Sequence, residues 1–161
     1  MNTLPPYQYG SARTMVDLHG KYLQECLAVW KEAKDAKIAL PETDHPGYQS
    51  MERLLGHIFN AARIYMVWMA QKLDLPDPKI DPIPPFEEIE EKADSYLAHL
   101  IEQWQTPLAN IKPEQFGDQE YRSNWDVLYS IESMLEHAVM HPILHRVQLE
   151  ELMEEQGKLE G

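Results

Sequence analysis

Four stretches of this chain repeat apolar residues at spacings of three and four, the period of one face of an α-helix. They cover residues 11–38, 50–73, 86–105 and 125–155. No segment shows a convincing alternation of apolar and polar residues, the pattern that indicates a half-buried strand. Four amphipathic helices without a strand predict an all-α fold. A four-helix bundle is the architecture in which each of them can bury its apolar face.

Prolines and polar residues separate the four predicted helices. Segment 75–85 carries five of the twelve prolines, so we predict a stiff, extended connector and neither a helix nor a central strand. Region 107–125 is predicted to be irregular, and a connection of this length is often functional. We expect Tyr121 and Trp125 to hold that region against the core. Ser50 is a favourable N-cap for the second helix.

The length and composition narrow the class of protein. A chain of 161 residues predicts a single domain, 1–161, with about ten N-terminal and six C-terminal residues loosely attached. A formal net charge of −13 without a basic patch argues against nucleic acids and anionic membrane surfaces as partners. No apolar run approaches the roughly 20 residues of a membrane helix, and the N-terminus lacks the features of a signal peptide. We therefore expect a soluble, cytoplasmic protein.

The one cysteine, Cys26, excludes an intramolecular disulfide bond. It lies within the apolar pattern of the first helix. We expect it to pack in or near the core and not to act as a nucleophile, because free cysteine is among the most buried residue types.

Three of the seven histidines, His137, His141 and His145, lie four residues apart in the last predicted helix. Residues at this spacing lie above one another on the same helix face, so two imidazoles can close on one metal ion. His57 lies at the flank of the buried face of the second helix, where it can point inward. Imidazole suits zinc, nickel, copper and iron. Three histidines on zinc leave a position for water or substrate, which is typical of catalytic sites.

Other interpretations of the histidines remain open at this point. All of them can be ordinary packing or surface residues, and Pro142, between two proposed ligands, can either shape a site or simply bend the helix. The chain has no HExxH motif, and only His45 follows a glutamate by three residues, so zincin and ferritin-like di-iron sites are excluded. His45 and His99 are interpreted as exposed and partly exposed residues. His19 lies either near the site or on the helix surface, and the surface position is favoured.

The last helix combines three histidines, an arginine and a glutamine, at His137, His141, His145, Arg146 and Gln148. Together with the pattern Ser-x3-Leu-Leu-Gly-His that ends at His57, this motif resembles the DinB/YfiT-like superfamily of metal-dependent enzymes. The resemblance covers most of the chain, roughly residues 11–155. The chain departs from the family pattern at Met140, where an asparagine is common, at Val147, where a small residue is common, and at Pro142.

The resemblance implies that His57, His141 and His145 bind the metal ion, with His137 supporting the ligands or lining the pocket. It implies zinc or nickel most often, sometimes manganese or iron, and frequently a homodimer. Gln148 lies near enough in sequence to supply a polar partner. Arg146 is expected to support the fold or an anionic group, and its angle of about 100° from His145 around the helix favours a structural salt bridge.

The resemblance also implies a function with a small-molecule substrate. Its characterised members resemble S-transferases that use a low-molecular-weight thiol such as bacillithiol or mycothiol, so transfer of a thiol to a small electrophile is the first hypothesis. Hydrolysis by a metal-activated water is the second. A non-catalytic, stress-associated metal-binding protein is the third. A pocket with room and charge for a peptide-like thiol would favour transfer, whereas a closed four-ligand site would favour the non-catalytic protein.

Overall fold

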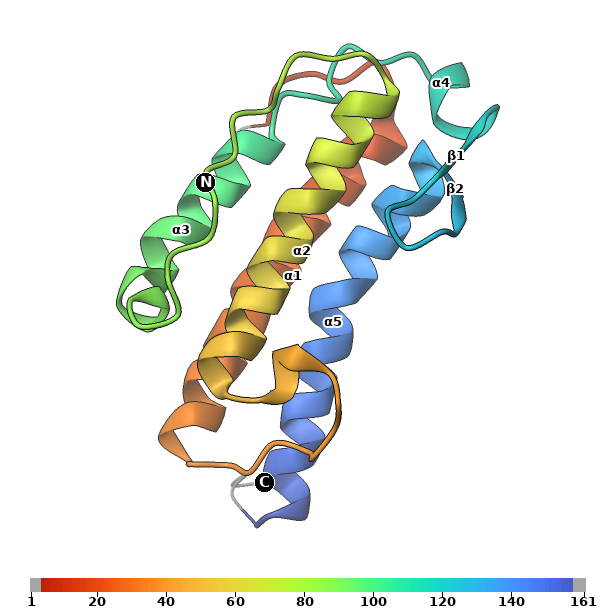
Figure 1. Ribbon diagram of the computed structural model, residues 1–161. Coiled ribbons are helices and arrows are strands. Elements are labelled where there is room, and N and C mark those ends of the chain that lie inside the picture. The colour runs from red at the N-terminus through yellow and green to blue at the C-terminus, as the bar shows by residue number, and fades with distance from the viewer. Residues whose placement is uncertain (1–3, 158–161) are drawn as a thin grey trace.

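The computed structural model describes residues 4–157 of the chain. Within this range the fold is mostly helical, which confirms the predicted all-α class. The long helices are α1 (Gly10–Asp35), α2 (Met51–Lys72), α3 (Ile89–Trp104) and α5 (Ile131–Glu155). Helices α1 and α2 lie at the centre of the molecule, with α3 along one side and α5 along the other (Figure 1). None of the described helices is long and apolar enough to cross a membrane.

Shorter elements occupy the connections between the long helices. A 3-10 turn, η1 (Pro46–Tyr48), precedes α2, and a single helical turn, α4 (Glu114–Gly117), follows α3. Strands β1 (Glu120–Arg122) and β2 (Leu128–Ser130) form an antiparallel hairpin in which Tyr121 lies opposite Tyr129. The sequence analysis predicts no strand here and is wrong on this point. A three-residue strand is too short for an alternation of apolar and polar residues to be visible.

Local signals explain where the helices begin and end. The Ser50 hydroxyl accepts a hydrogen bond from the Arg53 amide at 3.0 Å, so the predicted N-cap of α2 is confirmed. Helix α5 begins six residues later than the predicted Trp125, because the hairpin occupies the intervening residues and the Ser130 hydroxyl caps the Ser133 amide at 3.0 Å. Helix α1 ends before the predicted residue 38, since Lys37 has a φ of +54° in the left-handed region.

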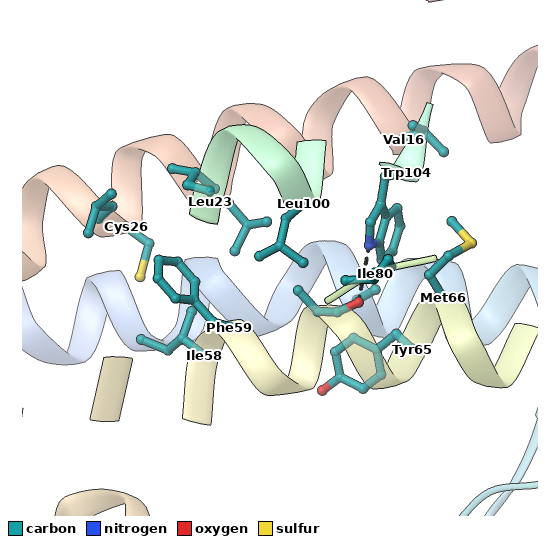
Figure 2. Close-up of a cluster of buried hydrophobic side chains, with 14 of the residues drawn as sticks. Val16, Leu23, Cys26, Ile58, Phe59, Tyr65, Met66, Ile80, Leu100 and Trp104 are labelled. Carbon is teal, nitrogen blue, oxygen red and sulfur yellow. Dashed lines mark hydrogen bonds between the residues drawn. The ribbon is translucent and has the colours of Figure 1, made fainter. Parts of the chain in front are cut away.

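The core lies between the long helices and includes large side chains from α1, α2 and α3 (Figure 2). Trp104, the last residue of α3, is part of this core. The Trp104 indole donates a hydrogen bond to the Ala62 carbonyl at 3.1 Å. Cys26 is buried in this core, as predicted, and burial raises the pKa of its thiol to about 12. Helix α5 is continuous through Pro142.

The proline-rich connector, residues 75–85, forms neither a helix nor a strand, as predicted, and is tied to its neighbours by side chains. Ile80 is buried in the core, and the Ile80 carbonyl accepts a hydrogen bond from the Arg63 guanidinium at 2.9 Å. His99 is partly exposed, as expected, and its Nε2 accepts a hydrogen bond from the Asp81 amide at 2.9 Å. These bonds replace the secondary-structure partners that a proline-rich segment lacks.

Described residues near both ends of the chain contact the rest of the fold. Leu4 is buried, and the Gln8 amide donates a hydrogen bond to the Ala109 carbonyl at 3.0 Å. The Gln156 side chain bonds both the amide and the carbonyl of Ala39, at 2.9 and 2.8 Å. That the first ten and last six residues are loosely attached stays a prediction. For residues 1–3 and 158–161 the prediction lies outside the described part of the chain.

Candidate metal centre

Three histidine side chains converge at one point between α2 and α5. The Nε2 atom of His141 lies 3.1 Å from Nε2 of His57 and 3.2 Å from Nε2 of His145. His141 and His145 are one helical turn apart on α5, and α2 packs against that turn with His57 facing it. Among the histidine, cysteine, aspartate and glutamate side chains of residues 4–157, these three form a group that could hold a metal ion. Their ligating atoms all lie within 4.8 Å of one another.

Two of the separations between the three ligating nitrogens are close to those expected around a metal ion. Imidazole nitrogens bound to zinc at about 2.0–2.1 Å in tetrahedral geometry lie roughly 3.3–3.4 Å apart. The observed separations of 3.1 and 3.2 Å are close to this value. Three imidazoles also leave one tetrahedral position without a protein ligand. The residues brought together here are those that the sequence motif suggests.

The surroundings keep these imidazoles neutral. Burial, followed by the neighbouring His145 and His57, lowers the pKa of His141 to about 2. Burial also lowers the pKa of His145 to about 4, and burial followed by the nearby His45 lowers the pKa of His57. A neutral imidazole has one unprotonated nitrogen, which is the form that binds a metal ion. Where Nδ1 carries the proton of each ring, the three Nε2 atoms are all unprotonated, and a cation between them is then the partner that such a group can share.

A pair of polar side chains orients His145. The amide Oε1 of Gln148 lies 3.4 Å from Nδ1 of His145 and accepts a hydrogen bond from the Tyr48 hydroxyl at 2.9 Å. An acceptor beside Nδ1 favours the tautomer with its proton on Nδ1, which leaves Nε2 free for a metal. The structure therefore places Gln148 beside a proposed ligand, and it adds Tyr48, whose position the sequence motif does not indicate.

Replacing Gln148 with leucine is expected to weaken metal binding by about 10–100-fold, because His145 loses the partner that selects its tautomer. Competition with a chromophoric chelator measures the effect for zinc and nickel. The control is Gln156→Leu, the same change just beyond the end of α5, where the side chain bonds Ala39 instead. An affinity that falls equally in both variants would contradict the assigned role.

His137 and Arg146 lie outside the group of three. The His137 ring contacts Tyr65 and Trp125, with ring centres 5.3 and 5.7 Å apart, and it lines a cavity beside His141. The Arg146 guanidinium lies 3.5 Å from the Glu150 carboxylate and 3.9 Å from that of Glu25. Arg146 thus links α5 to α1, which agrees with the structural salt bridge favoured from the sequence.

Two further histidines differ from their predicted surroundings. His19 is buried and not on the helix surface, because its ring stacks on Trp104 with centres 3.7 Å apart, and burial lowers its pKa to about 3. It does not belong to the group of three ligands. His45 is exposed, as predicted, but its ring centre lies 5.0 Å from that of His57. Its position depends on Gly47, where a Cβ atom would lie 3.0 Å from the His45 ring.

Two cavities share His57 and Asn60 as lining residues. The first, with a volume of about 310 Å³, extends towards the hairpin and is also lined by Tyr65, Trp125, His137 and His141. We call it the hairpin cavity. The second, with a volume of about 370 Å³, extends towards the start of α2 and is also lined by His45, Gly47, Arg53, Gly56 and Phe86. We call it the Arg53 cavity. Both volumes are in the range of small-molecule sites.

The Arg53 cavity carries an exposed guanidinium that pairs with no acidic side chain of the described residues. The Arg53 guanidinium lies 4.6 Å from the centre of the Phe86 ring, and within residues 4–157 no carboxylate forms an ion pair with it. Gly56 makes room for Phe86, because a Cβ atom at this position would lie 2.6 Å from the ring. In a chain with a net charge of −13, an unpaired arginine beside a candidate metal centre favours a small anionic ligand there.

Comparisons of the chain with protein-family models, curated proteins and solved structures gave no match. The resemblance of the histidine motif to the DinB/YfiT-like superfamily therefore stays a prediction. What the site can do must be argued from its own geometry, namely three convergent imidazoles and two adjoining cavities.

Proposed function

We propose that this chain is a four-helix bundle of the DinB/YfiT type and a metal-dependent S-transferase. It joins a low-molecular-weight thiol to a small electrophile. The observation that carries the proposal is the position of the three histidines between two cavities that share His57 and Asn60. A transferase must bring two small molecules to one point, and two cavities that share His57 provide a separate space for each molecule beside the three histidines.

Each part of the site has a role in this proposal. His57, His141 and His145 would hold zinc or nickel, and the ion, when bound, would lower the pKa of a thiol so that the thiolate is available at neutral pH. Arg53 attracts an anionic group of the thiol compound into its cavity. The electrophile enters the hairpin cavity, on the other side of His57.

The proposed reaction is a substitution. The sulfur forms a bond to the electrophilic carbon, and the bond from that carbon to its leaving group breaks. The leaving group takes the electron pair, and the thiol proton passes to water. Burial of the three imidazoles keeps them neutral, so they do not compete for that proton near pH 7.

Hydrolysis is the second candidate, since three imidazole ligands also leave a position for an activated water. It gives no role to the second cavity or to the unpaired Arg53. A non-catalytic metal protein would be favoured by a closed, four-ligand site. The ligand group found in the described residues has three members.

The test uses protein loaded with zinc or nickel, 1-chloro-2,4-dinitrobenzene as a general electrophile, and either bacillithiol or uncharged 2-mercaptoethanol. We expect metal-dependent thioether formation that can be followed by absorbance. Arg53→Met should raise the KM for the anionic thiol about tenfold, the effect of losing one charged contact. It should leave the KM for 2-mercaptoethanol unchanged.

Two results would overturn the proposal. One is metal-loaded protein that accelerates no thioether formation with either thiol. The other is protein that hydrolyses esters but transfers no thiol, which would favour the hydrolase. Equal changes of KM for both thiols in Arg53→Met would remove the assigned role of Arg53 and leave the transfer reaction itself standing.

A further inference from the structure

The hairpin cavity is walled by aromatic rings from three different elements. Tyr65 comes from α2, Trp125 from the loop of the β1–β2 hairpin and His137 from α5. The ring centres of Tyr65 and His137 are 5.3 Å apart, those of Trp125 and His137 are 5.7 Å apart, and those of Tyr65 and Trp125 are 6.2 Å apart. The three rings thus form one continuous aromatic wall beside His141.

The orientation of these rings suits a flat molecule. The Trp125 and His137 rings are within 30° of parallel, whereas Tyr65 stands at 73° to Trp125 and 89° to His137. A planar ring that stacks on the indole therefore meets Tyr65 edge to face. Both arrangements are favourable for aromatic pairs.

Trp125, in the loop of the hairpin, is far more exposed to solvent than the other tryptophans of the chain. The indole is 41% exposed, whereas Trp30, Trp68 and Trp104 are each at most 2% exposed. The Trp125 side chain is nevertheless held in place, because its Nε1 donates a hydrogen bond to the Tyr129 hydroxyl at 3.2 Å. The turn is also braced, since the Arg122 guanidinium lies 2.7 Å from the carboxylate of Asp126, the residue that follows Trp125. A fixed, half-open indole at a cavity wall is a surface that a ligand can cover.

The lining of the hairpin cavity favours a neutral ligand. Among residues 4–157, no Asp, Glu, Lys or Arg lines it. Apart from the histidines, Tyr65 and Trp125, its polar side chains are the amides of Asn60 and Asn124. Aromatic walls often bind quaternary ammonium ions, but a divalent metal held by His57 and His141 on the same wall would repel a cation. An anion would find the metal ion as its attracting charge but no basic side chain in the described lining, and the aromatic walls would strip part of its hydration.

The volume limits the size of the ligand. An engineered apolar cavity of about 150 Å³ holds benzene. The hairpin cavity, at about 310 Å³, is twice as large. One or two fused rings therefore match the available space.

We propose that the hairpin cavity selects a neutral, planar aromatic molecule of one or two rings, which stacks on Trp125 with one end directed at His57 and His141. This inference rests on the proposed function, in which that molecule is the electrophile. It names Trp125 as a residue that determines specificity, although Trp125 is remote from the three ligands in sequence.

The experiment measures binding by calorimetry to zinc-loaded protein in the absence of thiol. The probes are 1-nitronaphthalene, saturated nitrocyclohexane, cationic N-methylquinolinium and anionic 1-naphthalenesulfonate. We expect 1-nitronaphthalene to bind about tenfold more tightly than each of the other three. Trp125→Ala should remove about tenfold of this affinity, the effect of one lost stacking contact, and Trp125→Phe should restore most of it. Leu128→Ala, an exposed residue of the same hairpin outside the cavity, is the matched control and should change nothing.

Tighter binding of N-methylquinolinium or 1-naphthalenesulfonate would overturn the choice of a neutral ligand. Equal binding of 1-nitronaphthalene and nitrocyclohexane would overturn the aromatic selectivity. An unchanged affinity in Trp125→Ala would overturn the assigned location. Because no thiol is present, intact selective binding together with failed thioether formation would contradict the proposed function and not this inference.

Discussion

Replacing His141 with alanine is expected to lower the affinity for zinc or nickel by more than 100-fold. His141 is the central member of the group, with its Nε2 at 3.1 and 3.2 Å from the Nε2 atoms of His57 and His145. Loss of a residue that only supports a ligand costs about 10–100-fold in metal affinity, so loss of a ligand must cost more. Metal content by mass spectrometry, on protein purified without an affinity tag, measures the effect. Wild-type protein should hold close to one ion per chain.

The matched control for this prediction is His137→Ala. His137 lies one helical turn before His141 on α5 but outside the group of three ligands. The His137→Ala variant should therefore bind metal as the wild type does. Circular dichroism should show that both variants remain helical. Equal losses in the two variants would place the metal elsewhere on α5. Wild-type protein that binds neither zinc nor nickel after reconstitution would remove the metal centre altogether.

Replacing Trp104 with alanine is expected to reduce the free energy of unfolding by about 3–5 kcal/mol, the usual cost of deleting a large buried aromatic side chain. Trp104, labelled in Figure 2, lies among the buried side chains of the core. It is 1% exposed, stacks on the buried His19 ring and donates a hydrogen bond to the Ala62 carbonyl of α2. Its loss leaves a cavity and removes the partner of a buried carbonyl group. Urea unfolding of metal-free protein measures the change, since bound metal would add its own stabilisation.

Trp125→Ala is the control of the same residue type. The Trp125 side chain is 41% exposed and lies outside the core, so its loss should cost less than about 1 kcal/mol. A large loss for Trp125 would mean that the hairpin contributes to the core, contrary to its position. The small expected loss also allows a binding defect of Trp125→Ala to be assigned to the cavity and not to unfolding.

The helices were predictable because their signals are local. Apolar residues recur every three or four positions over 16 to 26 residues in α1, α2, α3 and α5, and chance rarely produces so long a pattern. The Ser50 cap acts over three residues. The start of α5 was less predictable, since both a hairpin and a helix are compatible with the residues around Trp125. Pairing of Glu120 with Ser130 decides between them.

Part of the candidate metal centre was also within reach of the sequence. His141 and His145 are four residues apart, and four residues make about one helical turn, so their proximity follows from the helix alone. Gln148 is three residues beyond His145 and within reach for the same reason. His57 is 84 residues from His141. No periodicity indicates that these two meet, and the family resemblance suggested it.

The sequence by itself therefore determined the helical class, the approximate helix ranges and the α5 half of the ligand group. Only the tertiary structure decided what surrounds that group, with His45 beside His57, Arg53 on the wall of one cavity and Trp125 on the wall of the other. The physical reason is the range of the interactions. Helix periodicity and capping act over a few residues. The positions of these three side chains depend on loop conformation and on packing between distant segments, which no local spacing in the chain specifies.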